Sequence, residues 1–303
     1  MLPIKEYLAC PKTTAIVLLE HFGQWLPEQT YLKIMFRLEL GYRLDLKAPK
    51  TFSEKIQWLK LYDRKPQYTT LVDKYAVKEY VAKKIGSKFI IPTLGIWDKP
   101  KEIDWDSLPD SFVLKTTHGG GSAGVVICKN KDTFNREKAV ERLNASLKQD
   151  IYRYLKEWPY KDVPRRILAE KYITPQGGEG DLPDYKWYCF NGEPKYCQVI
   201  QNRTTKETID FFDTNWVHQE FVGLNPTASQ ATISPARPSS LEDQIIIARE
   251  LSKDVPFSRV DLYESDGNIY FGEITFYPAS GMGVFSPYQY NEILGQMIVL
   301  PTR

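Results

Sequence analysis

Residues 112–127 read FVLKTTHGGGSAGVVI and give the clearest indication of the fold. Lys115 lies in an apolar run that predicts a β-strand, a triple glycine follows at positions 119–121, and a second β-rich run starts at Val125. A glycine loop between two strands lets backbone N–H groups approach the phosphates of a nucleotide, and a lysine beneath it supplies positive charge. The stretch therefore favours a nucleotide-dependent enzyme over a generic α/β domain.

The composition is that of a globular protein with balanced charge. The 303 residues are 42% hydrophobic and 26% charged, with a formal net charge of +2. This balance argues against a nucleic-acid-binding surface. The four cysteines show no CxxC spacing, so we expect neither a zinc site nor a disulfide framework, and we expect a reducing cytoplasmic location. The hydropathy pattern also predicts no signal peptide and no membrane-spanning segment.

Aromatic residues make up 13% of the chain. Residues of this kind usually pack in the core or on half-buried strands. A second interpretation is that some of them line a carbohydrate-binding site, because the apolar faces of sugars pack on aromatic rings. Composition alone leaves both interpretations open.

The hydrophobic periodicity predicts a helical N-terminal region followed by mixed strands and helices. We expect helices over 31–38, after Ser53 acting as an N-cap, over 73–84, over 137–156 as one long helix, and over 241–252. We expect strands over 112–114, 125–127, 167–173, 185–189 and 196–200, the last two joined at Asn191-Gly192. This mixture indicates an α+β fold rather than a doubly wound parallel sheet.

Residues 259–281 read RVDLYESDGNIYFGEITFYPASG and predict a β-hairpin that turns at Asp266-Gly267. Side chains alternate between the two faces of a strand, so the register decides whether Asp261 and Glu273 converge. A two-residue loop with regular pairing would place Asp261 opposite Gly272 and point Glu273 to the other face.

We predict instead a three-residue loop over 265–267, or an equivalent bulge. Asp261, Glu273 and Thr275 would then share one face and form an oxygen-rich cluster suited to Mg²⁺, which uses few protein carboxylates. Arg259 would project from the same face and contact a phosphoryl group. The alternative is an ordinary solvent-exposed hairpin face, which the lysine and glycine loop of 112–127 make less favourable.

Taken together, these segments resemble the ATP-grasp superfamily and, more closely, its TupA-like branch from polysaccharide and teichuronopeptide biosynthesis. The matching segments are DKYAVKEYV from Asp73, FVLKTTHGGGSAGV from Phe112, ILAEKYI from Ile167, DYKWYCFNGEPKY from Asp184 and SRVDLY…IYFGEITFYPASG from Ser258. They occur in the family's order and cover about residues 50–300. The resemblance implies an ATP-grasp fold with two α+β lobes around ATP. We accordingly divide the chain into a helical N-terminal region (1–66), a pre-grasp segment (67–110), a small lobe with the glycine loop (111–170) and a large lobe with the metal hairpin (171–303).

The resemblance also implies roles for individual residues. The ATP phosphates would contact Lys74, Lys115, Gly119, Gly120, Gly121 and Ser122. The adenine would lie against Glu170 and the backbone of Lys171, Tyr172 and Ile173. Mg²⁺ would be bound by Asp261, Glu273 and Thr275, the last standing where the superfamily usually has Asn. Lys186 and Arg259 would contact phosphate, Arg203 would stabilise an acyl phosphate, and either Glu179 or Asp181 would hold the ribose.

Enzymes of this superfamily typically phosphorylate a carboxylate and let an amine displace the phosphate. The resemblance to the TupA-like branch implies amide formation between an amino acid and a uronic acid of a surface or capsular polysaccharide, with peripheral association with the assembly machinery. The glycine loop would act as a lid over the acyl phosphate, and the saccharide would bind near 277–281 and the 225–240 loop. His118 is a candidate base, a phosphate contact or an exposed residue.

Two other function classes stay open at this point. A glycosyltransferase would use a DxD-like acid pair, and the chain has one at Asp104-Trp105-Asp106, although no apolar strand leads into it. A non-catalytic protein would keep the ATP-binding fold without turnover. The presence of Lys74, Lys115, Asp261 and Glu273 together argues against the second alternative.

Overall fold

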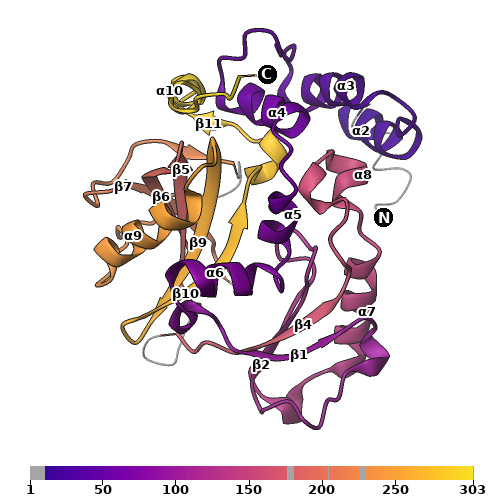
Figure 1. Ribbon diagram of the computed structural model, residues 1–303, viewed down its shortest axis with the longest axis vertical. Helices are drawn as coiled ribbons and strands as arrows, with labels where there is room; N and C mark the ends of the chain where they lie inside the picture. The colour runs from indigo at the N-terminus through magenta and orange to yellow at the C-terminus, as the bar shows by residue number, and fades with distance from the viewer. Residues whose placement is uncertain (1–10, 176–180, 204, 225–228, 303) are drawn as a thin grey trace.

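The computed structural model describes residues 11–175, 181–203, 205–224 and 229–302. Within this part of the chain, two antiparallel sheets of four and five strands are accompanied by helices and by one small two-stranded sheet (Figure 1). The four-stranded sheet lies at the bottom of Figure 1 and the five-stranded sheet at the left. The predicted α+β class is confirmed.

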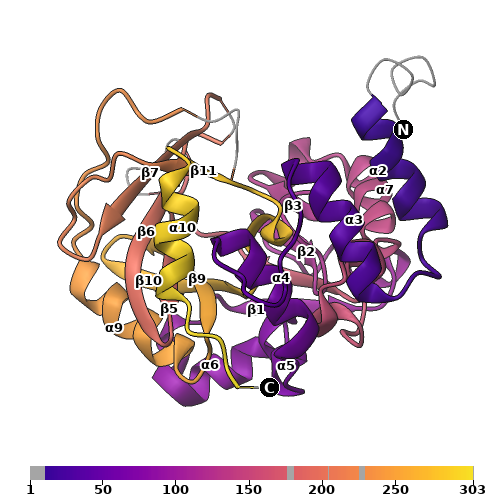
Figure 2. The same ribbon diagram turned by 90° about the horizontal axis from the view of Figure 1, so that it is seen from above.

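The N-terminal region is helical, as predicted. It contains α2 (Pro11–Phe22), α3 (Glu28–Leu40) and α4 (Phe52–Tyr62), followed by α5 (Gln67–Val72), α6 (Val77–Ile85) and η1 (Ser87–Phe89). Figure 2 shows α2 and α3 on the side of the molecule opposite the five-stranded sheet. The prediction of Ser53 as an N-cap was wrong: Thr51 caps α4, because its side chain accepts from the Glu54 N–H while Glu54 accepts from the Thr51 N–H.

The four-stranded sheet has the order β1-β4-β2-β3. Its strands are β1 (Thr93–Trp97), β2 (Phe112–Thr116), β3 (Val125–Cys128) and β4 (Ile167–Lys171), with η2 (Pro100–Glu102) and η3 (Lys131–Thr133) in the connections. The helix α7 (Arg136–Leu147) covers one face, where Leu143 packs with Phe112 and Leu114 in a separate apolar cluster. β1 pairs with β4 although it comes from the 67–110 segment, so the division of the chain into four segments stays a prediction.

Two helices replace the single long helix predicted over 137–156. α7 ends at Leu147 and α8 (Ile151–Leu155) begins after Asp150, whose side chain accepts from the Arg153 N–H at 2.8 Å. An aspartate that bonds a backbone N–H three residues ahead starts a new helix, because it satisfies an N–H that lacks a helical acceptor. η4 (Trp158–Tyr160) then leads towards β4.

The five-stranded sheet has the order β10-β9-β5-β6-β7. Its strands are β5 (Asp184–Phe190), β6 (Glu193–Gln201), β7 (Thr208–Asp213), β9 (Phe257–Ser265) and β10 (Asn268–Thr275). The predicted turn between β5 and β6 is confirmed, with positive φ at Asn191 (51°) and Gly192 (84°). The remaining elements are β8 (Val222–Gly223), α9 (Leu241–Ser252), η5 (Pro278–Gly281), β11 (Phe285–Ser286) and α10 (Gln289–Met297), and α9 has the bounds predicted for it.

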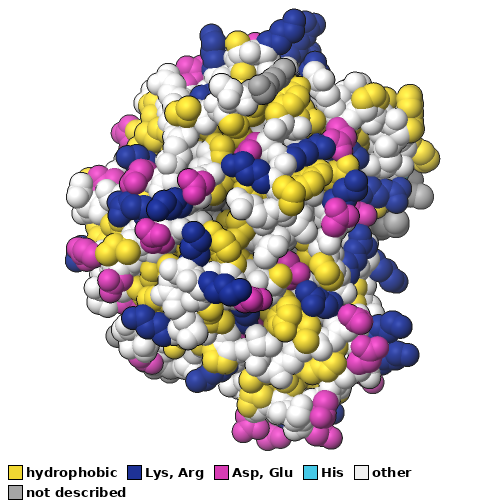
Figure 3. Space-filling view, viewed as in Figure 1, with side chains coloured by type: hydrophobic (Ala, Val, Ile, Leu, Met, Phe, Trp, Pro, Cys, Tyr) yellow, Lys and Arg dark blue, Asp and Glu magenta, His cyan; other side chains and the backbone are white. Residues whose placement is uncertain are grey.

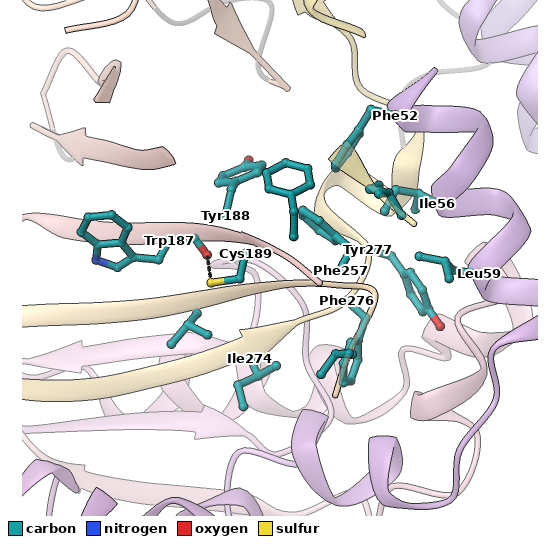
Figure 4. Close-up of a cluster of buried hydrophobic side chains, with 14 of the residues drawn as sticks. Phe52, Ile56, Leu59, Trp187, Tyr188, Cys189, Phe257, Ile274, Phe276 and Tyr277 are labelled. Carbon is teal, nitrogen blue, oxygen red and sulfur yellow. Dashed lines mark hydrogen bonds between the residues drawn. The ribbon is translucent and has the colours of Figure 1, made fainter. Parts of the chain in front are cut away.

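Aromatic side chains build the main core and join α4 to the five-stranded sheet. Figure 4 shows Phe52, Ile56 and Leu59 of α4 pointing towards Phe257 and Tyr277. The rings of Phe52 and Phe257 meet edge to face with centroids 5.0 Å apart, a favourable arrangement beyond simple burial. Many of the aromatic residues therefore pack in the core, as the first interpretation of the composition predicted.

The surface carries charges of both signs. On the face shown in Figure 3, Lys and Arg side chains alternate with Asp and Glu and form no large patch of one sign. In the part of the chain that the structure describes, no helix has the length and apolarity needed to cross a bilayer.

Candidate functional site

The hairpin of β9 and β10 brings the two predicted metal-binding acids together. Its loop has two residues, because Ser265 pairs with Asn268, and regular pairing from this loop would leave Glu273 on the wrong face. A bulge at Gly272 shifts the register, so that Glu273 pairs with Asp261. The predicted convergence is therefore confirmed, and it comes from a bulge rather than from a longer loop.

Glycine suits the bulge because space there is limited. A Cβ at Gly272 would lie 3.1 Å from the carbonyl oxygen of Asp261 and 2.9 Å from the ring of Tyr263. A side chain at this position would require the ring of Tyr263 and the backbone of Asp261 to shift, so glycine lets the bulge keep the two strands close.

Asp261 is buried between two cations. It is 1% exposed, and its two oxygens lie 2.7 Å from Arg259 Nε and 2.8 Å from Arg259 Nη2, while Lys186 of β5 also donates to it. Arg259 Nη2 is 3.2 Å from Thr275 Oγ1 and 3.4 Å from Glu273 Oε1. Arg259 thus links the three predicted metal ligands.

Lys74 connects this hairpin with the glycine loop. Its Nζ lies 3.0 Å from Glu273 Oε2 and donates to the carbonyl oxygen of Gly119 at 2.6 Å. Burial would raise the pKa of Glu273, but Lys74, Lys186 and Arg259 outweigh burial and hold that pKa well below its usual range. Glu273 therefore stays ionised at neutral pH.

Lys115 and Lys78 both pair with the carboxylate of Glu170, and Lys78 was not among the predicted site residues. Glu170 lies on β4. Its Oε2 is 2.6 Å from Lys115 Nζ and its Oε1 is 2.6 Å from Lys78 Nζ. Burial would raise the pKa of Glu170, and the two lysines more than compensate and lower it. The predicted helix over 73–84 would have placed Lys78 on the same face as Lys74, four residues earlier. In the structure α6 begins at Val77, so Lys74 lies in the turn before the helix and the two lysines pair with different carboxylates.

Asp184 is a second missed residue. Its carboxylate lies 2.9 Å from Lys186 Nζ and 2.8 Å from Arg203 Nη2, and its Oδ1 is buried with no hydrogen-bond partner among the described residues. Asp184 and Lys186 are two residues apart on β5, so they share a face, and Lys186 pairs across to Asp261 on β9. Alternation along DYKWY would have identified Asp184.

The glycine loop is anchored at its base and exposed at its tip. Thr116 and Ser146 hydrogen-bond to each other at 2.7 Å, and Arg142 donates to the carbonyl oxygens of Ser122 (2.7 Å) and Ala123 (2.9 Å). Residues 120–123, which include Gly120, are solvent-exposed. Arg142 therefore fixes the backbone at Ser122 and Ala123, and the exposed residues Gly120 and Gly121 are the part of the loop that can move over a ligand.

At Gly124 and Gly121 the loop favours glycine, the first because space is limited and the second because of its backbone conformation. A Cβ at Gly124 would lie 2.2 Å from Ser146 Oγ, and Gly121 has a φ of +61°. His118 is 3% exposed, so it is not the exposed residue that was one of its alternatives. Burial and then Arg165 lower the pKa of His118, which favours a neutral ring.

The residues predicted to contact adenine lie at the end of β4 and directly after it. The Lys171 N–H donates to the carbonyl oxygen of Pro92 at 3.0 Å, and Tyr172 and Ile173 follow on the way from the four-stranded to the five-stranded sheet. Ser265 Oγ donates to the carbonyl oxygen of Thr174 at 2.6 Å and ties this connection to the hairpin. Asp181 is described, whereas Glu179 and positions 225–228 of the predicted saccharide loop lie outside the described residues.

The side chains on the hairpin fit Mg²⁺ by their chemistry. Two carboxylates and one hydroxyl share a face, and Glu273 keeps 29% of its side chain exposed. Both oxygens of Asp261 are engaged by cations, and no cluster of three or more His, Cys, Asp or Glu suited to a metal occurs in the described ranges. Such a set suits an ion that arrives with a nucleotide and takes most of its ligands from phosphate and water.

The acid pair at Asp104 and Asp106 lies in an exposed turn. Asp104 Oδ1 accepts from the N–H groups of Asp106 (3.2 Å) and Ser107 (3.4 Å), and Trp105 packs towards Phe112. The Asp104 carboxylate thus serves the local turn, and no observation here favours a nucleotide-sugar site.

Comparison with protein families decides the assignment. A family model described as TupA-like ATPgrasp matches residues 54–299. The chain belongs to the TupA-like ATP-grasp family. The family and fold predicted from the sequence are thereby confirmed, and the match includes the hairpin, the glycine loop, Lys74 and Lys78.

Solved structures similar to this TupA-like protein include amino-acid ligases. The D-alanine–D-alanine ligase of Helicobacter pylori is 17% identical with a TM-score of 0.45, over 82% of this chain and 69% of that one. The ligase of Bacillus anthracis complexed with ATP is 16% identical with a TM-score of 0.38, over 68% of this chain and 54% of that one. A RimK domain ATP-grasp protein of Sphaerobacter thermophilus is 12% identical with a TM-score of 0.43, over 78% of this chain and 70% of that one. TM-scores below 0.5 identify no substrate for this chain, and comparison with curated proteins finds no match.

Proposed function

We propose that this TupA-like protein is an ATP-dependent carboxylate–amine ligase that works through an acyl phosphate. The observation that carries the proposal is the path from the glycine loop to the hairpin: Lys74 contacts both Gly119 and Glu273. A phosphate-binding loop and a paired set of acids on facing elements are what transfer of a phosphoryl group requires.

The chain's cations would bind and orient the triphosphate. Lys74, Lys115, Lys186 and Arg259 each pair with a carboxylate of the site in this structure. Phosphate oxygens form the same charge-assisted hydrogen bonds, so a nucleotide would take over some of these contacts. Mg²⁺, held by Asp261, Glu273 and Thr275, would neutralise charge on the phosphates.

The reaction proceeds in two displacements. A carboxylate oxygen of the substrate attacks the γ-phosphorus of ATP, the bond to ADP breaks, and an acyl phosphate forms. The amine then attacks the acyl carbon, inorganic phosphate leaves, and the nitrogen loses a proton to give the amide. Arg203, which reaches the site through Asp184, would stabilise the acyl phosphate, and closure of the exposed loop residues Gly120 and Gly121 would exclude water.

The proposed substrates are an amino acid and a uronic acid of a surface or capsular polysaccharide, or of its precursor. Membership of the TupA-like family supports this choice. The saccharide would bind beside Tyr277–Gly281, which begins two residues after Thr275, and near the described part of the loop, 229–240. We place the reaction in the cytoplasm, where ATP is supplied, with peripheral association with the polysaccharide assembly machinery.

Mass spectrometry tests the proposal. The protein is incubated with Mg²⁺, ATP, a mixture of amino acids and an oligosaccharide that contains glucuronic acid. The expected products are ADP and a species with the mass of the saccharide plus one amino acid less one water. Asp261→Asn and Glu273→Gln should each abolish product, and ATP rather than a UDP-sugar should raise the melting temperature. Full saccharide-dependent ADP release by both variants would disprove the site.

A further inference from the structure

The buried face of α4 carries three polar side chains. Ser53, Gln57 and Lys60 follow each other at intervals of four and three residues, which places them on one side of the helix. None is more than 1% exposed. Polar groups that are buried to this degree need hydrogen-bond partners, so their partners indicate what this face does. We call these three residues the α4 polar face.

All three side chains donate to one short segment that follows the metal hairpin. Ser53 Oγ donates to the carbonyl oxygen of Gly283 at 2.9 Å. Gln57 Nε2 donates to the carbonyl oxygens of Ser280 (2.9 Å) and Gly281 (3.1 Å). Lys60 Nζ lies 2.7 Å from the carbonyl oxygen and 2.5 Å from the hydroxyl of Ser280. The α4 polar face therefore binds the backbone of residues 280–283.

This segment has a backbone conformation that needs support. Ala279 and Ser280 have φ of 46° and 54°, and Gly281 follows with 64°. Side-chain-bearing residues rarely take left-handed conformations, and such residues persist where the surroundings hold them. A Cβ on Gly281 would lie 2.5 Å from Ile56 Cγ2, so α4 is in direct contact with the turn.

Lys60 also reaches the part of the chain that carries the glycine loop. Its Nζ donates to the carbonyl oxygen of Leu155, at the end of α8, at 2.9 Å. Among the described residues no carboxylate oxygen lies within 4 Å of Lys60 Nζ, although the charge of buried Glu157 acts on it, and its hydrogen bonds go to Leu155 and Ser280. One ammonium group thus ties together α4, α8 and η5.

We propose that the α4 polar face positions the Tyr277–Gly281 turn for the saccharide substrate, with Lys60 as its main positioning residue. The turn begins two residues after Thr275, so its conformation sets the edge of the site beside the proposed metal ligands. The inference rests on the proposed ligase function for its substrate. It gives the helical N-terminal region a direct part in that function.

The test compares Lys60→Met with Lys55→Met in the full chain. Lys55 lies on the same helix, and its Nζ donates to the carbonyl oxygen of Ile298 at 2.7 Å, so its loss removes a similar bond without touching the turn. Three quantities are measured: amide hydrogen exchange in the peptide 277–283, the KM for ATP, and the KM for the glucuronic-acid oligosaccharide.

Lys60→Met should accelerate exchange in 277–283 at least tenfold and raise the saccharide KM at least fivefold, with the ATP KM changed less than twofold. Lys55→Met should leave all three within twofold, and Lys60→Arg, which keeps donors at the site, should recover most of the loss. If Lys60→Met does not fold, Gln57→Leu removes two bonds to the same turn and should show the same pattern.

Equal exchange in the two methionine variants, or equal rises in both KM values, would overturn the inference. The proposed ligase function fails separately, when the wild-type protein makes no amide product. In that case the exchange measurement still decides whether the α4 polar face holds the turn.

Discussion

Asp261→Asn should destabilise the protein far more than Glu273→Gln. Asp261 is 1% exposed and holds Arg259 and Lys186 through contacts of 2.7–2.8 Å and shorter. The neutral amide would turn its NH₂ group towards one of these cations and leave a buried charge without its partner. Breaking a buried ion pair in this way typically costs about 3–5 kcal/mol.

Glu273 makes weaker contacts, which sets the size of the difference. Its side chain is 29% exposed, and its carboxylate oxygens lie 3.0 Å from Lys74 Nζ and 3.4 Å from Arg259 Nη2. Water can therefore solvate these two cations in part when Gln replaces Glu273. We expect a cost of about 1 kcal/mol for Glu273→Gln. The two variants should therefore differ by about 2 kcal/mol or more, a factor of about 30 in the ratio of folded to unfolded protein.

Urea unfolding followed by tryptophan fluorescence measures this difference. The comparison uses wild type and both variants at pH 7 without nucleotide, where Glu273 is ionised. Replacing Arg259 and Asp261 together by apolar residues should cost less than the sum of the single changes, since it removes the charge and its partner. Equal stability of Asp261→Asn and Glu273→Gln would refute the reasoning, because it would mean that Asp261 does not hold buried cations.

Three further predictions concern the turn, the buried lysine and the glycine loop. Gly281→Ala should destabilise the protein by about 2 kcal/mol more than Gly41→Ala. Both glycines have positive φ, but only Gly281 has atoms within 4 Å of the added methyl; equal costs in thermal unfolding would contradict the close packing. Burial lowers the pKa of Lys60 from 10.5 to about 8. Between these values the unfolded chain binds the extra proton, so wild-type stability relative to Lys60→Met should rise with pH, by up to about 1.4 kcal/mol per unit. A flat difference from pH 8 to 10 in urea titrations would contradict the lowered pKa and show that the attraction of Glu157 offsets the desolvation of this ammonium. Gly124→Ala should push Ser146 away, since the added Cβ would lie 2.2 Å from its Oγ, and weaken ATP binding about tenfold by calorimetry; unchanged affinity would mean that the loop base does not shape the site.

The sequence predicted which residues form the site better than it predicted how the fold brings them together. It identified Asp261 and Glu273 as a pair, because strand alternation and a hairpin turn leave few arrangements. The sequence left a longer loop and a bulge as alternatives, and the pairing of the strands decides for the bulge at Gly272. Lys78 and Asp184 were missed although helix and strand periodicity placed them beside predicted site residues.

The errors in secondary structure have local causes. Asp150 ends one helical run and caps the next, which a hydrophobic stripe across 137–156 does not reveal. Serine is a common N-cap residue, but here Thr51 and Glu54 form the capping box. Ser53 instead donates a hydrogen bond to the carbonyl oxygen of Gly283. That second role depends on a contact 230 residues away in the chain, which no local pattern predicts.

The most direct test of the ligase proposal follows oxygen from the substrate carboxylate. The glucuronic-acid oligosaccharide is labelled with ¹⁸O in its carboxyl group and incubated with Mg²⁺, ATP and the reactive amino acid. An acyl phosphate passes one carboxylate oxygen to the phosphate that leaves, so we predict one ¹⁸O atom in inorganic phosphate for each amide formed. Amide formation with unlabelled phosphate, or with the label in AMP, would contradict the account.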